Sequence, residues 1–120
     1  MTTSTLFSSL GYSQNQGGPP VPAATIVNAG GPITRAVFTL TVTPASGWAE
    51  AAVSWGPDGL VWHGQASVYS APGGGSVEQP QYIHDGPASG GSVGGDDAQY
   101  FQASLINVSP GATATLTMTY

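Results

Sequence analysis

Apolar and polar residues alternate along most of the chain after residue 33. In the stretch ITRAVFTLTVT (33–43), Ala36, Phe38, Leu40 and Val42 alternate with Arg35, Val37, Thr39 and Thr41. Successive side chains of a strand point to opposite faces, so this alternation predicts a β-strand with one buried face. The same pattern recurs at 49–55, 60–69, 99–107 and 112–120. The apolar positions in these stretches are Ala49, Ala51, Val53, Trp55, Leu60, Trp62, Ala66, Val68, Phe101, Ala103, Leu105, Ala112, Ala114, Leu116, Met118 and Tyr120.

Turn residues separate these stretches. GPDG (56–59) carries proline and aspartate where turns favour them, which predicts a hairpin over 49–69. The stretch 77–84 is a poorer strand, and Pro80 places it at a sheet edge because proline cannot donate to a ladder. No helix of ordinary length is visible. The sequence therefore predicts an all-β fold, a single antiparallel β-sandwich of about seven strands, with a small barrel as the other closure.

The first part of the chain lacks this alternation. Residues 1–22 are small and polar and end in QGGPPVP, which predicts an extended N-terminal arm ahead of a domain over 23–120. The exceptions in the arm are Leu6, Phe7, Leu10 and Tyr12. The segment is either a tail without contacts or an arm whose apolar residues bind a neighbouring subunit. We take the four residues as candidate partner-binding residues.

Charge excludes several kinds of partner. Charged residues make up only 6 % of the chain, against about 25 % in ordinary soluble domains. The net charge is −5 and Arg35 is the only basic side chain, so nucleic acid and anionic membranes are not expected partners. Cysteine is absent, and the N-terminus has no signal-peptide pattern, so we expect synthesis in a cytoplasm. Such a surface suits a subunit of an assembly.

The stretch GPASGGSVGGDDAQYF (86–101) is the main candidate for chemistry. His84, Asp85, Asp96 and Asp97 flank it and offer oxygen ligands for calcium, but the spacing matches no EF-hand or calcium repeat. No lysine and no helix follow the glycines, which excludes a phosphate loop. We therefore interpret 85–97 as a connector with an exposed tip, and calcium remains open.

Catalysis has little support in the sequence. His84 and Asp85 are adjacent, so on a strand they point to opposite faces and form no evident dyad. A glycosidase would need two carboxylates across a cleft, and Glu50 and Glu78 are the candidates. We predict no enzyme activity, and no catalytic, cofactor or metal site.

Tryptophan supplies the best binding candidate. Trp48, Trp55 and Trp62 recur at an interval of seven. Trp55 and Trp62 fall in the apolar phase of their strands, whereas Trp48 follows Gly47 in a turn and is the one expected at the surface. Trp48 is therefore a candidate partner-binding residue, and surface glycans are a candidate ligand. The sequon Asn107–Ser109 is interpreted as the turn into the last strand.

Two stretches bear a resemblance to known families. YFQASLINVSPGATATLTMTY and FTLTVTPASGW resemble the strand–turn–strand endings of Ig-like and fibronectin-like sandwiches. The whole profile, with a flexible arm and no lysine or cysteine, resembles small virion structural proteins of bacteriophages, of the capsid decoration or cement type.

This resemblance implies an Ig-like fold and a non-enzymatic role on the capsid surface. The implied partners are the major capsid protein or other virion subunits, and the implied state is a homo-oligomer, with a trimer as one form. The arm and one sheet edge would make the contacts. The alternative is a carbohydrate-binding or adhesion module.

Overall fold

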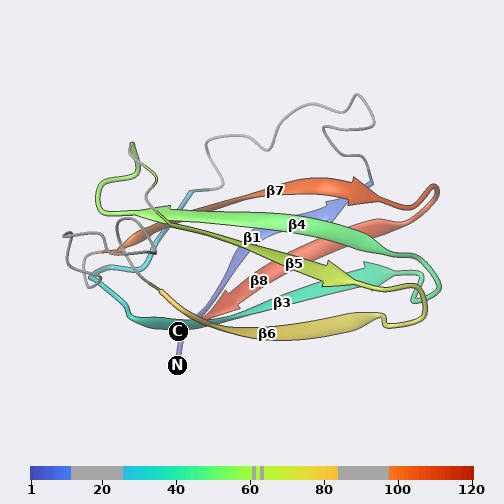
Figure 1. Cartoon of the computed structure of the whole chain (residues 1–120), viewed down its shortest axis with the longest axis horizontal. Helices are drawn as coiled ribbons and strands as arrows, with labels where there is room; N and C mark the ends of the chain where they lie inside the picture. Colours follow the sequence, from blue (N-terminus) through green and yellow to red (C-terminus); the bar gives the residue numbers. More distant parts are fainter. Residues whose placement is uncertain (12–25, 61, 63, 84–97) are drawn as a thin grey trace.

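The computed structural model describes residues 1–11, 26–60, 62, 64–83 and 98–120, and these form an all-β structure (Figure 1). Within these ranges there is no helix, and so none long and apolar enough to cross a membrane. The strands are β1 (Thr3–Leu10), β2 (Val27–Asn28), β3 (Arg35–Thr43), β4 (Ala49–Gly56), β5 (Gly64–Ser70), β6 (Ser76–Tyr82), β7 (Tyr100–Val108) and β8 (Thr113–Thr119). The sequence predicted about seven strands and did not foresee β1 or β2.

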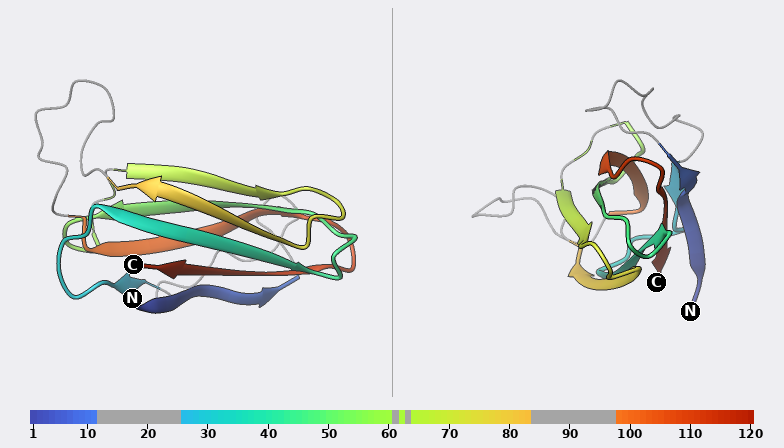
Figure 2. Two further views of the ribbon diagram at one scale, coloured as in Figure 1. Left: turned by 90° about the horizontal axis from the view of Figure 1, so that it is seen from below. Right: turned by 90° about the vertical axis from the view of Figure 1, so that its right-hand side faces the viewer.

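The strands form two antiparallel sheets of four, in the orders β1-β8-β3-β6 and β2-β7-β4-β5. Figure 2 shows the two layers, and its left view looks onto the first sheet. The first strand pairs with the last, the second with the seventh, the third with the sixth and the fourth with the fifth. The chain is therefore one long antiparallel hairpin rolled into a β-sandwich, which is the topology of an eight-stranded jelly roll.

The predicted Ig-like strand order is not the one observed. In an Ig fold the last strand extends the sheet of the strand before it. Here β8 leaves β7 and lies between β1 and β3 in the opposite sheet. The turn Ser109–Ala112 makes this crossing, and it is closed by the Ala112 amide donating to the Ser109 carbonyl at 3.1 Å. Local alternation cannot distinguish the two orders, because it specifies which face of a strand is buried but not which strand lies beside it.

The predicted alternation is confirmed in four strands. The inward positions of β3, β4, β7 and β8 are buried in one hydrophobic cluster between the sheets. These residues are Ala36, Phe38, Leu40, Val42, Ala49, Ala51, Val53, Trp55, Phe101, Ala103, Leu105, Ala114, Leu116 and Met118. The edge position predicted for residues 77–84 is also confirmed, since β6 pairs only with β3.

An aromatic cluster joins the two sheets. The Trp55 ring of β4 stacks on Phe38 of β3, in the opposite sheet, with centroids 6.4 Å apart. It also meets Phe101 of β7 at 6.3 Å. Gly64 pairs with Trp55 across the β4–β5 ladder, and the indole occupies the space where a side chain of residue 64 would lie. The absence of a Cβ at Gly64 therefore allows Trp55 to lie between the sheets.

The predicted arm over residues 1–22 is wrong for its first half. β1 adds to the sheet beside β8, and Leu6 and Phe7 are buried in the core. The register shifts between Thr5 and Phe7 and again between Phe7 and Leu10, which are β-bulges. A bulge breaks the alternation, so two adjacent residues both face inward. The strand was missed for this reason, because its sequence has no period of two.

The predicted strand over 60–69 begins too early. β5 starts at Gly64, and Leu60 is 82 % exposed rather than inward-facing. Trp62 is half-buried and precedes the strand. The Leu60 amide donates to the Asp58 side chain at 2.8 Å, so the turn predicted at 56–59 extends further along the chain. The hairpin itself is confirmed by the β4–β5 pairing.

Replacement of Gly64 by alanine should destabilise the protein by about 1–3 kcal/mol, because the new methyl group overlaps the Trp55 indole. Urea unfolding followed by tryptophan fluorescence measures this change. Gly31→Ala is the control, since a Cβ there meets nothing within 4 Å and its φ is not positive. Equal effects of the two substitutions would contradict the role given to Gly64.

Replacement of Leu6 by alanine should cost about 2–5 kcal/mol, the range for a buried leucine whose loss leaves a cavity. Ser8→Ala, at an exposed position of the same strand, should stay within about 0.5 kcal/mol. Thermal melting of both variants makes the comparison. If Leu6→Ala melts like the parent protein, β1 does not belong to the cooperative core.

Candidate interaction face

One outer face of the sandwich is covered with threonine. We call it the threonine face, and it consists of the outward threonine side chains of β1, β8 and β3. Every outward position of β8 is threonine, because its inward positions hold the alanine, leucine and methionine of the core. The residues are Thr3, Thr5, Thr39, Thr41, Thr43, Thr113, Thr115, Thr117 and Thr119.

Strand register places these threonines in rows across the sheet. Thr5 pairs with Thr117, and Thr117 pairs with Thr39. Neighbouring rows contain Thr41 beside Thr115 and Thr43 beside Thr113. The rows arise from pairing between residues 70 or more positions apart in sequence, so they exist only in the folded protein.

Cross-strand hydrogen bonds satisfy part of the polarity of this face. The Thr3 and Thr119 hydroxyls lie 3.1 Å apart, and the Thr41 hydroxyl lies 3.2 Å from that of Ser76 on β6. The Thr115 hydroxyl accepts from the Ser9 amide at 3.0 Å. Hydroxyls paired in this way leave methyl groups as part of the outer surface. Burying such a face against a partner therefore costs less than burying unpaired polar groups.

Charge is scarce on this sheet. Among the four strands of the sheet, which lie within the described residues, the charged side chains are Arg35 on β3 and Glu78 on β6. Glu78 lies directly across from Thr39 in the β3–β6 ladder, so both charges lie on or beside β3. The outward threonines of β8 and of β1, by contrast, have no charged side chain on their own strands. Desolvation of the β1 and β8 part of the face therefore includes no charged side chain.

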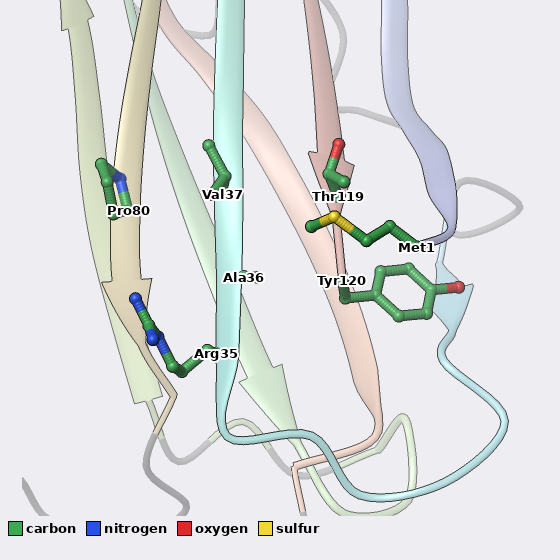
Figure 3. Close-up of a pocket in the computed structure, with 7 residues that line it drawn as sticks. All are labelled: Met1, Arg35, Ala36, Val37, Pro80, Thr119 and Tyr120. Atoms are coloured by element: carbon green, nitrogen blue, oxygen red, sulfur yellow. The ribbon is translucent and has the colours of Figure 1, made fainter.

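A shallow hollow lies at one end of the threonine face (Figure 3). Its volume is about 330 Å³, and it is lined by Met1, Arg35, Ala36, Val37, Pro80, Thr119 and Tyr120. Figure 3 shows Val37 between Arg35 and Pro80 on one side and Met1 and Tyr120 on the other. Register brings these residues together, since Val37 pairs with both Pro80 and Thr119.

Arg35 is the cationic side chain of the hollow. Its guanidinium lies over the Tyr82 ring, 5.3 Å from the centroid, a cation–π contact worth about 0.5–1 kcal/mol at an exposed site. The stack restrains the side chain at the β3–β6 edge. A guanidinium beside apolar walls can bind a carboxylate with a short apolar stem. The hollow therefore adds a cationic contact at one end of the face.

The residues predicted to bind a partner have different positions in the structure. Leu6 and Phe7 are buried, which corrects the prediction that they extend to a neighbouring subunit. Leu10 is partly buried and packs against the core. Tyr12 lies outside the described residues. Trp48 is half-buried rather than fully exposed.

Trp48 is held through its backbone. Its amide donates to the Ser109 hydroxyl at 3.0 Å, and the Ser109 amide donates to the Trp48 carbonyl at 2.9 Å. Ser109 is itself buried. The serine of the Asn107–Ser109 sequon therefore joins the β3–β4 turn to the crossing between sheets, in agreement with its interpretation as a turn.

The carboxylates considered for catalysis are far from facing one another. Glu50 lies on β4 and Glu78 on β6, and each points outward from a different sheet. His84, Asp85, Asp96 and Asp97, with the connector over 85–97, lie outside the described residues. In the part of the chain that is described, no group of three His, Cys, Asp or Glu side chains could hold a metal ion.

Aromatic side chains do not gather into one platform. Trp48 precedes β4 and Trp62 follows it, so the two half-buried tryptophans flank opposite ends of that strand. The exposed tyrosines are likewise divided, with Tyr69 on β5 and Tyr82 on β6, in different sheets.

Sequence reasoning missed the threonine face, although one signal was present. Four threonines alternate with apolar residues in ATATLTMTY (112–120), and three follow the same phase in β3. What the alternation cannot show is that β1, β8 and β3 are neighbours. No protein-family model, curated protein or solved structure matches this chain.

Replacement of Ser109 by alanine should destabilise the protein by about 1–3 kcal/mol, because the Trp48 amide then loses its acceptor. Chemical unfolding quantifies the loss. The control is Ser67→Ala, at an exposed position on β5, for which no comparable cost is expected. A Ser109→Ala protein as stable as that control would show that the hydrogen bond contributes nothing.

Proposed function

We propose that this chain is a non-enzymatic structural subunit of a virion, a capsid decoration or cement protein that binds and stabilises a capsid lattice. Its partners are the major capsid protein or other virion subunits, and it sits on the capsid surface as a homo-oligomer, with a trimer as one form. The threonine face, to which β1 contributes Thr3 and Thr5, replaces an extended arm as the main contact surface, since β1 belongs to the sandwich.

The observation that supports this proposal most is that β1 and β8, which carry most of the threonine face, have no charged side chain. Interface cores are depleted of charged residues, whereas free surfaces are usually rich in them. The molecule measures 43 × 27 × 26 Å, so a face along its length offers on the order of 1,000 Å², and a standard interface takes about 800 Å² per partner. One face is thus large enough for a specific contact.

The strand topology is compatible with a structural role in a capsid, but it does not by itself indicate that role. Jelly rolls occur in viral capsid and lectin domains, and a fold by itself does not specify a function. The choice between a structural and a glycan-binding role therefore rests on the surface. The divided positions of Trp48, Trp62, Tyr69 and Tyr82 give a carbohydrate-binding or adhesion module less support than a protein contact.

Particles from the source that encodes the chain should contain it in a fixed ratio to one major protein after density-gradient sedimentation, as quantified by mass spectrometry. Purified chain should rebind to particles stripped of it. The variant Thr117→Lys, with one charge on β8 between Thr5 and Thr39, should lose at least about tenfold in affinity because burying an unpaired charge is unfavourable.

The matched control is Ser104→Lys, which adds the same charge to the outer face of the other sheet. It should rebind like the parent chain. A chain found only outside large assemblies would overturn the proposed function. Equal rebinding of both variants would keep the subunit role but remove the threonine face as its contact.

A further inference from the structure

β1 is an edge strand that completes the core. Among the described strands its one sheet partner is β8. Leu6 and Phe7 are nevertheless fully or almost fully buried. The core is therefore incomplete unless some β1 occupies the place beside β8.

The strand pairing between β1 and β8 is irregular. Two register shifts fall within β1, one on each side of Phe7. Ser9 adopts a φ of 51°, a left-handed conformation that is unfavourable for a residue other than glycine. The regular part of the ladder runs from Thr2 to Thr5, which face Thr117–Tyr120. β1 thus depends on its buried side chains more than on a continuous ladder.

The segment that connects β1 to β2 has more residues than are needed for β1 to pair with β8 of the same chain. Leu10 pairs with Ala114, near the end of β7, whereas β2 pairs with Tyr100 and Phe101 at the start of β7. Figure 1 shows β1 ending beside the end of β7. The nine residues of β7 span about 30 Å. The segment from Gly11 to Ile26 reaches on the order of 50 Å when extended.

We propose that β1 exchanges between copies of this chain, so that β1 of one copy occupies the place beside β8 of another. The exchanged strand makes the same buried contacts and the same register as in the single molecule. Only the path of the segment that leads to β2 differs between the exchanged and the unexchanged state. The ratio of the two states therefore depends on the concentration of other copies, relative to the effective concentration of the chain's own β1.

A second copy is the occupant that fits this place. The groove must accept adjacent buried leucine and phenylalanine side chains and a strand with two bulges, and β1 of an identical chain supplies both. With a linker of this length, the effective concentration of the chain's own β1 is on the order of millimolar. Exchange is therefore rare in dilute solution and extensive when copies are crowded. This inference stands whether or not the proposed function is correct.

Engineered disulfides test the exchange. The Thr3 and Thr119 hydroxyls lie 3.1 Å apart on β1 and β8, and the chain contains no cysteine of its own. Oxidised Thr3→Cys/Thr119→Cys protein should run as a monomer on non-reducing gels when oxidised near 1 µM. When it is oxidised near 1 mM, about half of the disulfides should join different chains.

Thr39→Cys/Thr117→Cys is the control pair, because it joins β3 to β8 in the same sheet and neither strand is exchanged. Its disulfide should stay within one chain at both concentrations. Disulfides of the Thr3/Thr119 pair that stay within one chain at 1 mM would overturn the exchange. Equal yields of joined chains from both pairs would overturn it as well, since they would show association without exchange.

A shortened connection gives an independent test. Deletion of residues 13–24 leaves a connection that reaches roughly 17 Å, too short for β1 to pair with its own β8. We expect a folded dimer or ring at every concentration, detected by light scattering together with circular dichroism and tryptophan fluorescence. An unfolded chain or a folded monomer would overturn the proposal.

Discussion

The packing of Trp55 between the sheets is the contact on which the rest of the structure depends. The indole touches Phe38 from one sheet and Phe101 from its own sheet. It can do so because Gly64, its cross-strand neighbour, leaves the space free. The same pairing sets the register of β4 on β5, and β4 in turn aligns β7. A single large side chain thus determines how the two layers meet.

The rolled hairpin places a second constraint on the molecule. Because the first strand pairs with the last, the sheet that bears the threonine face is complete only when the N-terminal residues return to β8. Leu6 and Phe7 then close one side of the core. Stability, the extent of the threonine face and the capacity for exchange all depend on the same short strand.

The residues of the outer surface are determined by the alternation that also places the core residues. Small and apolar residues face inward on β8 and β3, so the residues between them face outward, and here most are threonines. A β-branched residue suits a strand and also offers a methyl group and a hydroxyl to a partner. The resulting face is uncharged over β1 and β8, with Arg35 on β3 and Glu78 on β6 toward the other edge. This distribution is what a contact with another protein surface requires, and it is the basis of the proposed structural role.

The sequence by itself determined the strands with unbroken alternation, the residues they bury and the edge position of β6. A period of two and a proline are local signals, and β3, β4, β7, β8 and Pro80 follow them. It also led to the expectation that nucleic acid is not a partner, since Arg35 is the only lysine or arginine. Only the tertiary structure decided that β1 is a strand, because its bulges remove the local signal. It alone decided that β8 lies between β1 and β3, because pairing between distant segments depends on closing the whole roll. The threonine face and the Arg35 hollow follow from that pairing, so neither could be located before the fold was known.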